Sequence, residues 1–174
     1  MRDLYFVLIA AFVAVCIGLG LYFFLPSEKV SENETPQQHT EQVSAAERVA
    51  FRVIAKESFS SASERKNYIA RSEEAFRIIW ELAYDGETDT MPEINFEEEQ
   101  VIGIFDGEHG TGGYDVDVIE VRDTADMRTV RIVRIEPGEG CMTTQAITSP
   151  FVIIVLPASS KAPGKEETIR ATEC

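Results

Sequence analysis

Two carboxylates and one histidine have the side-chain types and spacing in this sequence that could serve acid–base catalysis or metal binding. Asp115 and Asp117 alternate with valines, so in a strand both would point to one face and could bind a cation or act as acid and base. His109 stands shortly before them, and no serine or cysteine has a spacing that makes it the base of a nucleophile. Carboxylate pairs arise easily in an acidic chain, so we favour a solvated strand face for the pair and a solvent-exposed loop for His109.

A glycine-rich segment precedes Asp115. Residues 107–114 read GEHGTGGY and lie between two expected strands. A phosphate cradle would need a lysine and a following helix whose N-terminus faces the anion, and neither is present. The glycines instead suit positive φ angles or the close approach of another backbone. Two interpretations stay open: a tight structural hairpin, and a loop that contacts a partner through Thr111, Gly112, Gly113 and Tyr114.

Two cysteines fall in the same half of the chain. In an oxidising compartment Cys141 and Cys174 could form a disulfide that joins the loop after Pro137 to the C-terminus. Closing a loop of roughly 33 residues would stabilise the fold by about 3 to 4 kcal/mol. Both residues could equally be free thiols.

One helix and a series of strands must position these residues. Ser72 offers an N-cap, and Phe76, Ile79, Trp80 and Ala83 follow at helical spacing, which favours a core role for Trp80 over a ligand platform. Residues 152–156 are apolar on both faces and should form a central strand. We expect an α+β fold, one mainly antiparallel β domain with a single packed helix. The expected strands are residues 48–55, 66–70, 101–105, 114–122, 127–135 and 147–156, with 167–172 as a further candidate.

An uncharged apolar run begins at Leu4 and ends at Leu25. At about 1.5 Å per residue it covers roughly 33 Å as a helix, enough to span a bilayer. We therefore divide the chain into a transmembrane anchor (residues 1–25), a flexible polar linker (26–46) and a folded domain (47–174). Arg2 and Lys29 balance one another across the run, but the three-residue tail favours a cytoplasmic N-terminus and an extracytoplasmic domain.

The charge balance excludes one class of partner. The chain carries 16 Lys and Arg against 30 Asp and Glu, a net charge of −14. So acidic a surface repels phosphate backbones, and no basic patch interrupts it in the sequence. We expect no nucleic-acid binding, no cofactor and no metal, and no small-molecule substrate is evident.

A set of short motifs runs through the expected domain: Asn95-Phe96, Val101-Ile102, Gly107, the TGGY of residues 111–114, Pro137-Gly138, the TSPF of residues 148–151, Val155 and Pro157. These motifs resemble the PrcB C-terminal domain family, and the resemblance covers roughly residues 48–157. The family is bacterial, exported or lipid-anchored, and is named for a non-catalytic subunit that associates with and stabilises a subtilisin-like surface protease. The resemblance thus implies an accessory role.

Our first hypothesis is therefore a membrane-anchored, extracytoplasmic and non-catalytic interaction module that binds a protein partner through residues 111–114. The resemblance makes a surface protease the candidate partner, which the module would serve as an accessory or stabilising subunit. The alternative is an envelope hydrolase or a cation-binding domain that uses Asp115, Asp117 or His109.

Overall fold

The computed structural model describes residues 46–88 and 90–173. Helix α2 (Glu73–Ala83) begins after Ser72, whose side chain accepts a hydrogen bond from the Ala75 amide at 3.2 Å. The expected apolar face, including Ile79 and Trp80, is buried. The predicted helix and the core role of Trp80 are confirmed.

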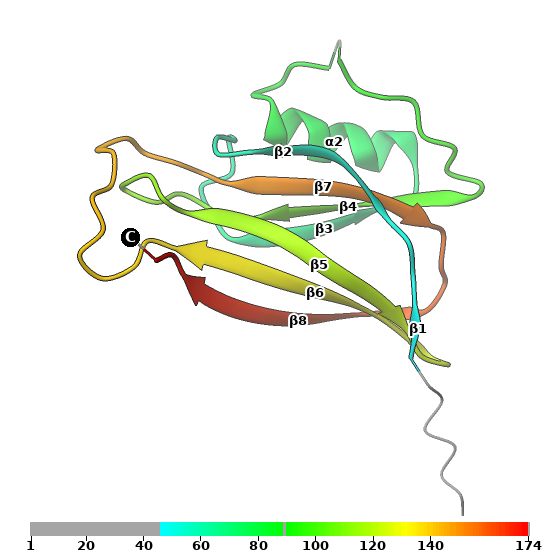
Figure 1. The fold of residues 1–174 in the computed structure, drawn as a ribbon. Helices are drawn as coiled ribbons and strands as arrows, with labels where there is room; N and C mark the ends of the chain where they lie inside the picture. The colour runs from blue at the N-terminus through cyan, green and yellow to red at the C-terminus, as the bar shows by residue number, and fades with distance from the viewer. Residues whose placement is uncertain (1–45, 89, 174) are drawn as a thin grey trace, which may run out of the picture. The chain divides into compact units, whose positions relative to one another are not determined.

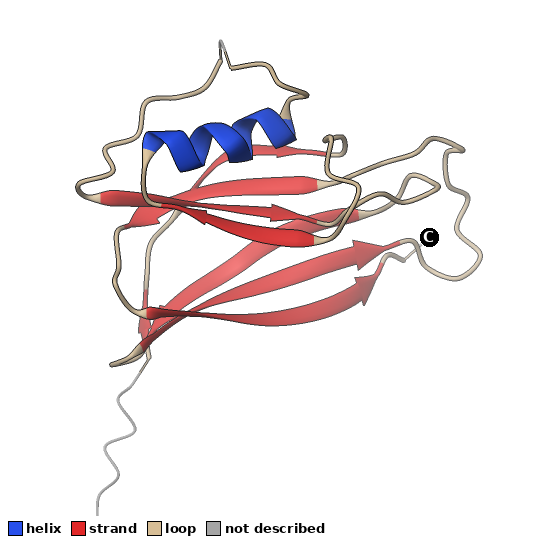
Figure 2. Cartoon of the chain, turned by 180° about the vertical axis from the view of Figure 1, so that it is seen from behind, coloured by secondary structure: helices blue, strands red, loops and turns tan. Residues whose placement is uncertain are grey.

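Helix α2 covers one of two sheets, and the second sheet packs on the opposite face of the first (Figures 1 and 2). The first sheet has the order β2-β7-β4-β3, and the second β1-β5-β6-β8. The described residues thus form three layers. The strands are β1 (Glu47–Arg48), β2 (Arg52–Glu57), β3 (Lys66–Ala70), β4 (Glu99–Phe105), β5 (Asp115–Asp123), β6 (Met127–Glu136), β7 (Phe151–Pro157) and β8 (Ala162–Ala171).

Strand β7 lies between β2 and β4, as its apolar sequence predicted. Alternate side chains of a strand point to opposite faces, so Phe151, Ile153 and Val155 pack under α2. Val152, Ile154 and Leu156 pack against the second sheet. Both faces of β7 are therefore buried, which explains why this strand is continuously apolar.

The pairing departs from a simple run of neighbouring strands. The expected strand 48–55 is two strands, because the chain crosses from one sheet to the other where Val49 and Phe51 pack into the core between them. Strand β7 begins only at Phe151, and β8 begins at Ala162, earlier than expected. Strand β8 pairs with β6 in parallel, because β7 returns the chain through the other sheet in between. The remaining pairs are antiparallel, so the mainly antiparallel domain with one packed helix is confirmed for the described residues.

A cluster of arginines surrounds one carboxylate within the second sheet and includes Arg48 of β1. Glu120 on β5 is buried beneath Arg131 at 2.8 Å, Arg122 at 2.8 Å and Arg48 at 3.0 Å. Hydrogen bonds from Arg131 and then Arg122 lower the pKa of this carboxyl from its ordinary 4.5 to about 2. Glu120 is therefore a charged link in the folded protein.

The predicted anchor (residues 1–25) and nearly all of the linker (26–46) lie outside the described residues. Within the described part of the chain, no helix is both long enough and apolar enough to cross a membrane.

Candidate functional site

The glycine-rich segment connects the two sheets. Strand β4 belongs to the first sheet and β5 to the second, so residues 106–114 are a crossover (Figure 1). The predicted hairpin is therefore wrong, because the two flanking strands do not pair with each other. Gly107 has a φ of 77°, and a Cβ there would lie 2.7 Å from the backbone nitrogen of Arg65. The crossover thus needs glycine at its first turn.

Asp106 starts this crossover as a buried carboxylate. Its side chain is 1 % exposed, yet it contacts three basic groups. Arg65 donates from Nε at 3.0 Å, and Arg134 of β6 donates to the same oxygen. The second oxygen lies 2.7 Å from Nε2 of His109. Because Arg134 comes from the other sheet, Asp106 links the two layers through charge as well as through apolar packing.

Arg134 extends this network to the edge of the second sheet. Its side chain is 2 % exposed and donates to Glu167 of β8 at 3.0 Å. Burial alone would raise the pKa of Glu167, but Arg134 and then Lys165 lower it below its ordinary value. The Nε of Arg134 is buried without a hydrogen-bond partner among the described residues. Asp106 and Glu167 therefore supply all the acceptors that Arg134 has there.

His109 is held within the crossover. Its side chain is 16 % exposed, so the predicted solvent-exposed loop histidine is wrong. The imidazole stacks on Tyr114 with centroids 3.8 Å apart, and the backbone of His109 exchanges two hydrogen bonds with Thr148. The pairing with Asp106 and the stacking hold the ring in place. Among the described residues, no serine, threonine or cysteine side chain hydrogen-bonds the imidazole.

Asp115 and Asp117 lie together on the outer face of β5, as the alternation predicted. Both are half-exposed and both bind Lys56 of β2, at 2.9 and 3.1 Å. His109 is engaged by a different carboxylate, Asp106. Each of the three residues predicted to suit catalysis or metal binding, Asp115, Asp117 and His109, is thus already bound to another side chain of the domain. Within the described ranges, no group of three or more His, Cys, Asp or Glu side chains could hold a metal ion.

A second loop, residues 137–149, is hydrogen-bonded to two of the four predicted contact residues, Thr111 and Gly112. The carbonyl of Thr111 accepts from the hydroxyl of Thr148 at 2.8 Å, and the amide of buried Gly112 donates to the carbonyl of Thr144 at 3.0 Å. Gly113 is exposed and has a φ of 93°. Tyr114 is half-buried against His109. We call residues 107–114 and 137–149 together the loop end.

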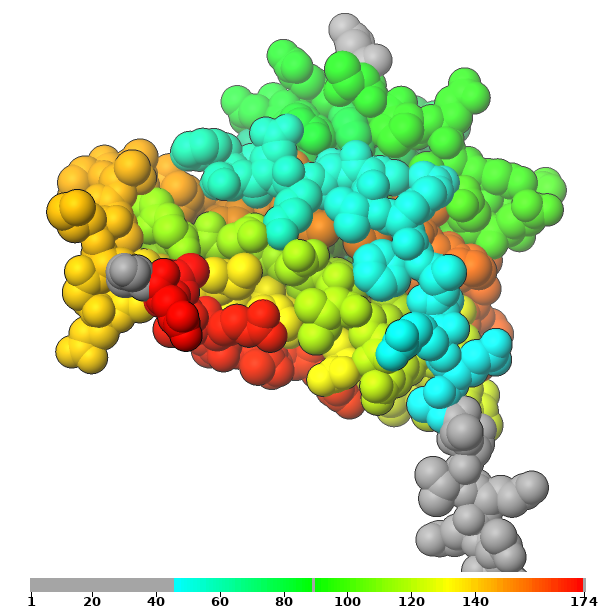
Figure 3. All heavy atoms as spheres, viewed as in Figure 1, coloured from blue at the N-terminus to red at the C-terminus, as the bar shows by residue number. Residues whose placement is uncertain are grey.

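The loop end displays two apolar side chains to solvent. Met142 is fully exposed, and Ile147 is 61 % exposed. The loop that carries them, residues 137–149, is coloured orange and forms the left end of the face in Figure 3. Apolar side chains on other elements, such as Phe59 and Ile169, are exposed to a similar degree, so exposure alone does not set this loop apart.

Cys141 belongs to the same loop and is disulfide-bonded. Its Sγ lies 3.9 Å from Oγ1 of Thr172, and the amide of Gly138 donates to that hydroxyl at 3.2 Å. The loop therefore lies against the end of the chain. The predicted partner, Cys174, lies outside the described residues, so the Cys141–Cys174 pair stays a prediction.

Sequence reasoning missed Asp106 and Arg134, although a signal for both exists. In β4 and the residue after it, Ile102, Ile104 and Asp106 share one face, and that face is buried between the sheets. In β6, Arg134 likewise shares a face with buried Ile132. A charged residue in register with buried apolar ones indicates a buried ion pair.

A comparison with known families matches residues 100–157 to the model described as PrcB C-terminal. This range runs from β4 through the loop end to the last residue of β7. No curated protein and no solved structure matches the chain. The resemblance drawn from the sequence is thereby confirmed for this segment.

Proposed function

Because residues 100–157 match the PrcB C-terminal family, we propose that this chain is a non-catalytic accessory module that binds a protein partner at the loop end. The proposed partner is a surface protease, which the module stabilises. The predicted contact residues Thr111, Gly112, Gly113 and Tyr114 enter this proposal in two roles. Gly113 and Tyr114 contribute surface, whereas Thr111 and Gly112 hold the second loop.

One observation carries the proposal: Met142 and Ile147 are exposed on a loop whose backbone is held in place. Residues 137–149 are hydrogen-bonded to the crossover at Gly112 and His109, and the crossover is tied to the core through Asp106. A surface that is ordered before binding loses less conformational entropy when a partner docks. Most of the free energy that is gained by burying apolar side chains on such a surface can then contribute to the affinity for the partner.

The arrangement around the predicted chemical residues supports the non-catalytic part of the proposal. Lys56 engages both Asp115 and Asp117, and Asp106 engages His109. A hydrolase would need one of these groups to be available to a nucleophile or a water. Because Lys56 occupies both aspartates, and because no serine, threonine or cysteine side chain of the described residues hydrogen-bonds His109, we favour structural roles over the alternative of an envelope hydrolase or a cation site.

Membrane anchoring and extracytoplasmic placement complete the proposal and rest on the sequence. The run from Leu4 to Leu25 is the proposed anchor, and residues 26–46 are the proposed tether. Beginning at Glu47, the domain would then be held close to a membrane-associated partner. Confinement at one membrane raises the effective concentration of both proteins.

The test is recovery of the protease with tagged full-length chain from native membranes. Replacing Met142→Ser and Ile147→Ser together removes the exposed apolar pair. The matched control is Ile78→Ser, which removes a similarly exposed isoleucine from α2. We expect the same subtilisin-like protease with the parent chain and the control, and about tenfold or greater loss with the double variant.

Two results would overturn the proposal. One is that no protease is recovered with the parent chain. The other is equal recovery with the double variant, which would place the contact elsewhere on the domain. Thermal unfolding of each variant, followed by circular dichroism, separates lost contact from lost folding.

A further inference from the structure

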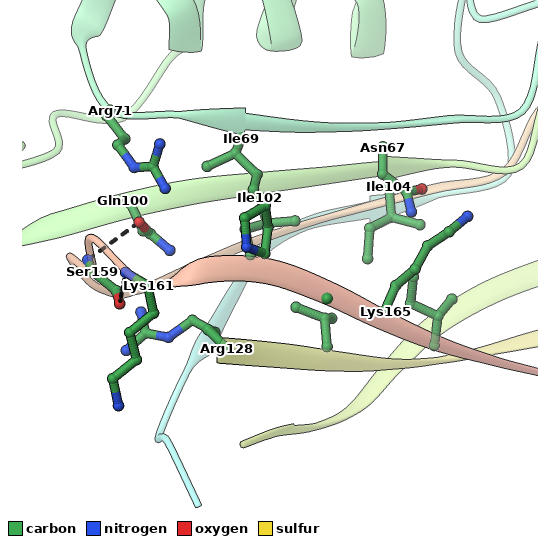
Figure 4. Close-up of a pocket in the computed structure, with 14 residues that line it drawn as sticks. Asn67, Ile69, Arg71, Gln100, Ile102, Ile104, Arg128, Ser159, Lys161 and Lys165 are labelled. Atoms are coloured by element: carbon green, nitrogen blue, oxygen red, sulfur yellow. Dashed lines mark hydrogen bonds between the residues drawn. The ribbon is translucent and has the colours of Figure 1, made fainter. Parts of the chain in front are cut away.

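A cleft of about 330 Å³ opens between the two sheets, on the side of β3 and β8. Its walls come from β3 and β4 of the first sheet and from β6 and β8 of the second, together with the residues that follow β7 (Figure 4). The cleft is separate from the loop end, because its lining includes no residue of 107–114 or 137–149. Its volume lies at the lower end of the range for small-molecule sites, about 300 to 1,000 Å³.

The middle of the cleft is apolar. Ile69, Ile102 and Ile104 line it from the first sheet, and Val130 and Ile132 from the second. From Gln100 to Ile104, β4 advances by about 13 Å at roughly 3.3 Å per residue. The cleft therefore offers an elongated apolar surface suited to an aliphatic chain.

One end of the cleft is cationic. Arg71, Arg128 and Lys161 lie around this end in Figure 4. Asp123 binds both Arg128, at 2.7 Å, and Lys161, at 3.1 Å. Arg71 has no ion pair or hydrogen bond from its side chain among the described residues. Asp123 thus pairs with two of the three cations, and the guanidinium of Arg71 is available to an anion.

A buried amide lies at the same end. Gln100 is 2 % exposed, and its side-chain oxygen accepts a hydrogen bond from the Ser159 amide at 3.3 Å, drawn as a dashed line in Figure 4. In this orientation the NH₂ group of Gln100 has no acceptor among the described residues. It is therefore a second donor beside Arg71.

The absence of acidic lining residues selects for anions. No Asp or Glu belongs to the described lining of this cleft, although acidic residues outnumber basic ones by 14 over the whole chain. Outside the cationic end, the fourth basic residue, Lys165, is already paired with Glu167 at 3.3 Å. The charge of the cleft is thus opposite to that of the chain and concentrated at one end.

We propose that this cleft binds an aliphatic monocarboxylate of medium chain length. The carboxylate lies against Arg71 and the amide of Gln100, and the hydrocarbon chain runs along the isoleucines. A peptide in the same place would have to pair its N–H and C=O groups with the edge strands β3 or β8, and the titration below distinguishes it from a monocarboxylate. This inference does not depend on the partner proposed above.

The experiment is isothermal titration calorimetry of full-length chain in neutral-lipid nanodiscs, with empty discs as the blank. Octanoate, decanoate and dodecanoate form one ligand series, and decylamine and a short peptide with an apolar C-terminus are the other probes. We expect binding of the carboxylates to tighten about fourfold per methylene until the cleft is filled. Decylamine and the peptide should bind at least about tenfold more weakly than decanoate.

Two variants locate the site. Arg71→Gln should weaken decanoate binding by about tenfold, because it removes a charged hydrogen-bond donor. Ile69→Glu places a carboxylate at a half-exposed position of the cleft and should abolish binding while the fold persists. The matched control, Arg170→Gln, removes an exposed arginine of β8 that does not line the cleft and should bind decanoate like the parent.

The proposal is overturned if decylamine or the peptide binds as tightly as decanoate. It is equally overturned if no carboxylate binds the parent chain, or if folded Arg71→Gln and Ile69→Glu chains both bind decanoate as the parent does. Melting curves of the unliganded variants establish that they are folded.

Discussion

Replacement of Asp106 by Asn tests whether the buried ion network holds the crossover in place. Asn has nearly the same shape but lacks the charge that faces Arg134, Arg65 and His109. Removing one partner of a buried ion pair costs about 3 to 5 kcal/mol. Glu167 still neutralises part of Arg134, and Arg65 is half-exposed to solvent. We therefore expect the lower end of that range, a loss of about 3 kcal/mol in the free energy of unfolding.

Urea unfolding of the full-length chain measures this loss. Trp80 is the only tryptophan of the sequence and lies on the buried face of α2, so its fluorescence reports the unfolding of the domain. With an m-value of about 2 kcal/mol/M, the midpoint should fall by about 1.5 M. The control Asp117→Asn removes a half-exposed carboxylate that binds Lys56 and should cost less than about 1 kcal/mol.

A second substitution separates the network from a general loss of packing. If Arg134 and Asp106 stabilise each other, the losses in the free energy of unfolding from Asp106→Asn and Arg134→Met should not add up in the double variant. We expect the double variant to lose at least about 1 kcal/mol less than the sum of the two single losses. If Asp106→Asn and the Asp117→Asn control lower the free energy of unfolding equally, the reasoning is refuted. The buried ion network would then stabilise the fold no more than an ion pair exposed to solvent does.

Three further predictions concern the crossover, pH and the loop end. Gly107→Ala should cost more than about 1 kcal/mol in the urea assay because of its positive φ and the nearby backbone, whereas Gly110→Ala, which has open space around it, should change stability by less than about 0.5 kcal/mol. Because Arg131 and its neighbours lower the pKa of Glu120 to about 2, the stability from this group is complete above pH 4.5 and is lost as pH falls towards 2. Acid unfolding of Glu120→Gln should therefore depend less steeply on pH over this window than that of the parent. Reduction, or Cys141→Ser, should lower stability by about 3 to 4 kcal/mol if the predicted loop to the C-terminus is closed, and equal melting with and without reductant would contradict it.

Local periodicity was sufficient to predict the elements that bury a regular apolar pattern. The capped helix after Ser72 and the fully apolar β7 both follow from such patterns. Strand β8 was only partly predicted, because its residues are mostly exposed and include Pro163 and Gly164, which weaken any strand signal. Its parallel pairing with β6 depends on the path of β7 through the other sheet, and no local pattern encodes that path.

The glycine-rich segment shows why turn signals alone did not predict the candidate site. Glycines between two strands are compatible with a hairpin or with a crossover between sheets, since both need positive φ and close backbone contact. The crossover is held by the partners of Asp106, and these are distant in sequence. Arg134 lies 28 residues downstream of Asp106, and Arg65 lies 41 residues upstream. The second loop, residues 137–149, was also not predictable, because its hydrogen bonds to Gly112 and His109 join residues distant in sequence.

Net charge describes the surface of this chain but not its interior. The value of −14 correctly favours an acidic exterior, where Asp115 and Asp117 lie. The alternation along β6, however, turns Arg128 and Arg134 towards the space between the sheets, together with buried Val130. A buried arginine needs an acceptor, and each of these two arginines has a carboxylate partner from another part of the chain. Buried Asp106 and Glu120 balance these two arginines in number, so the interior carries no excess positive charge. The cationic end of the cleft comes instead from the placement of Arg71, Arg128 and Lys161, which the composition, from which we expected no nucleic-acid binding, does not reveal.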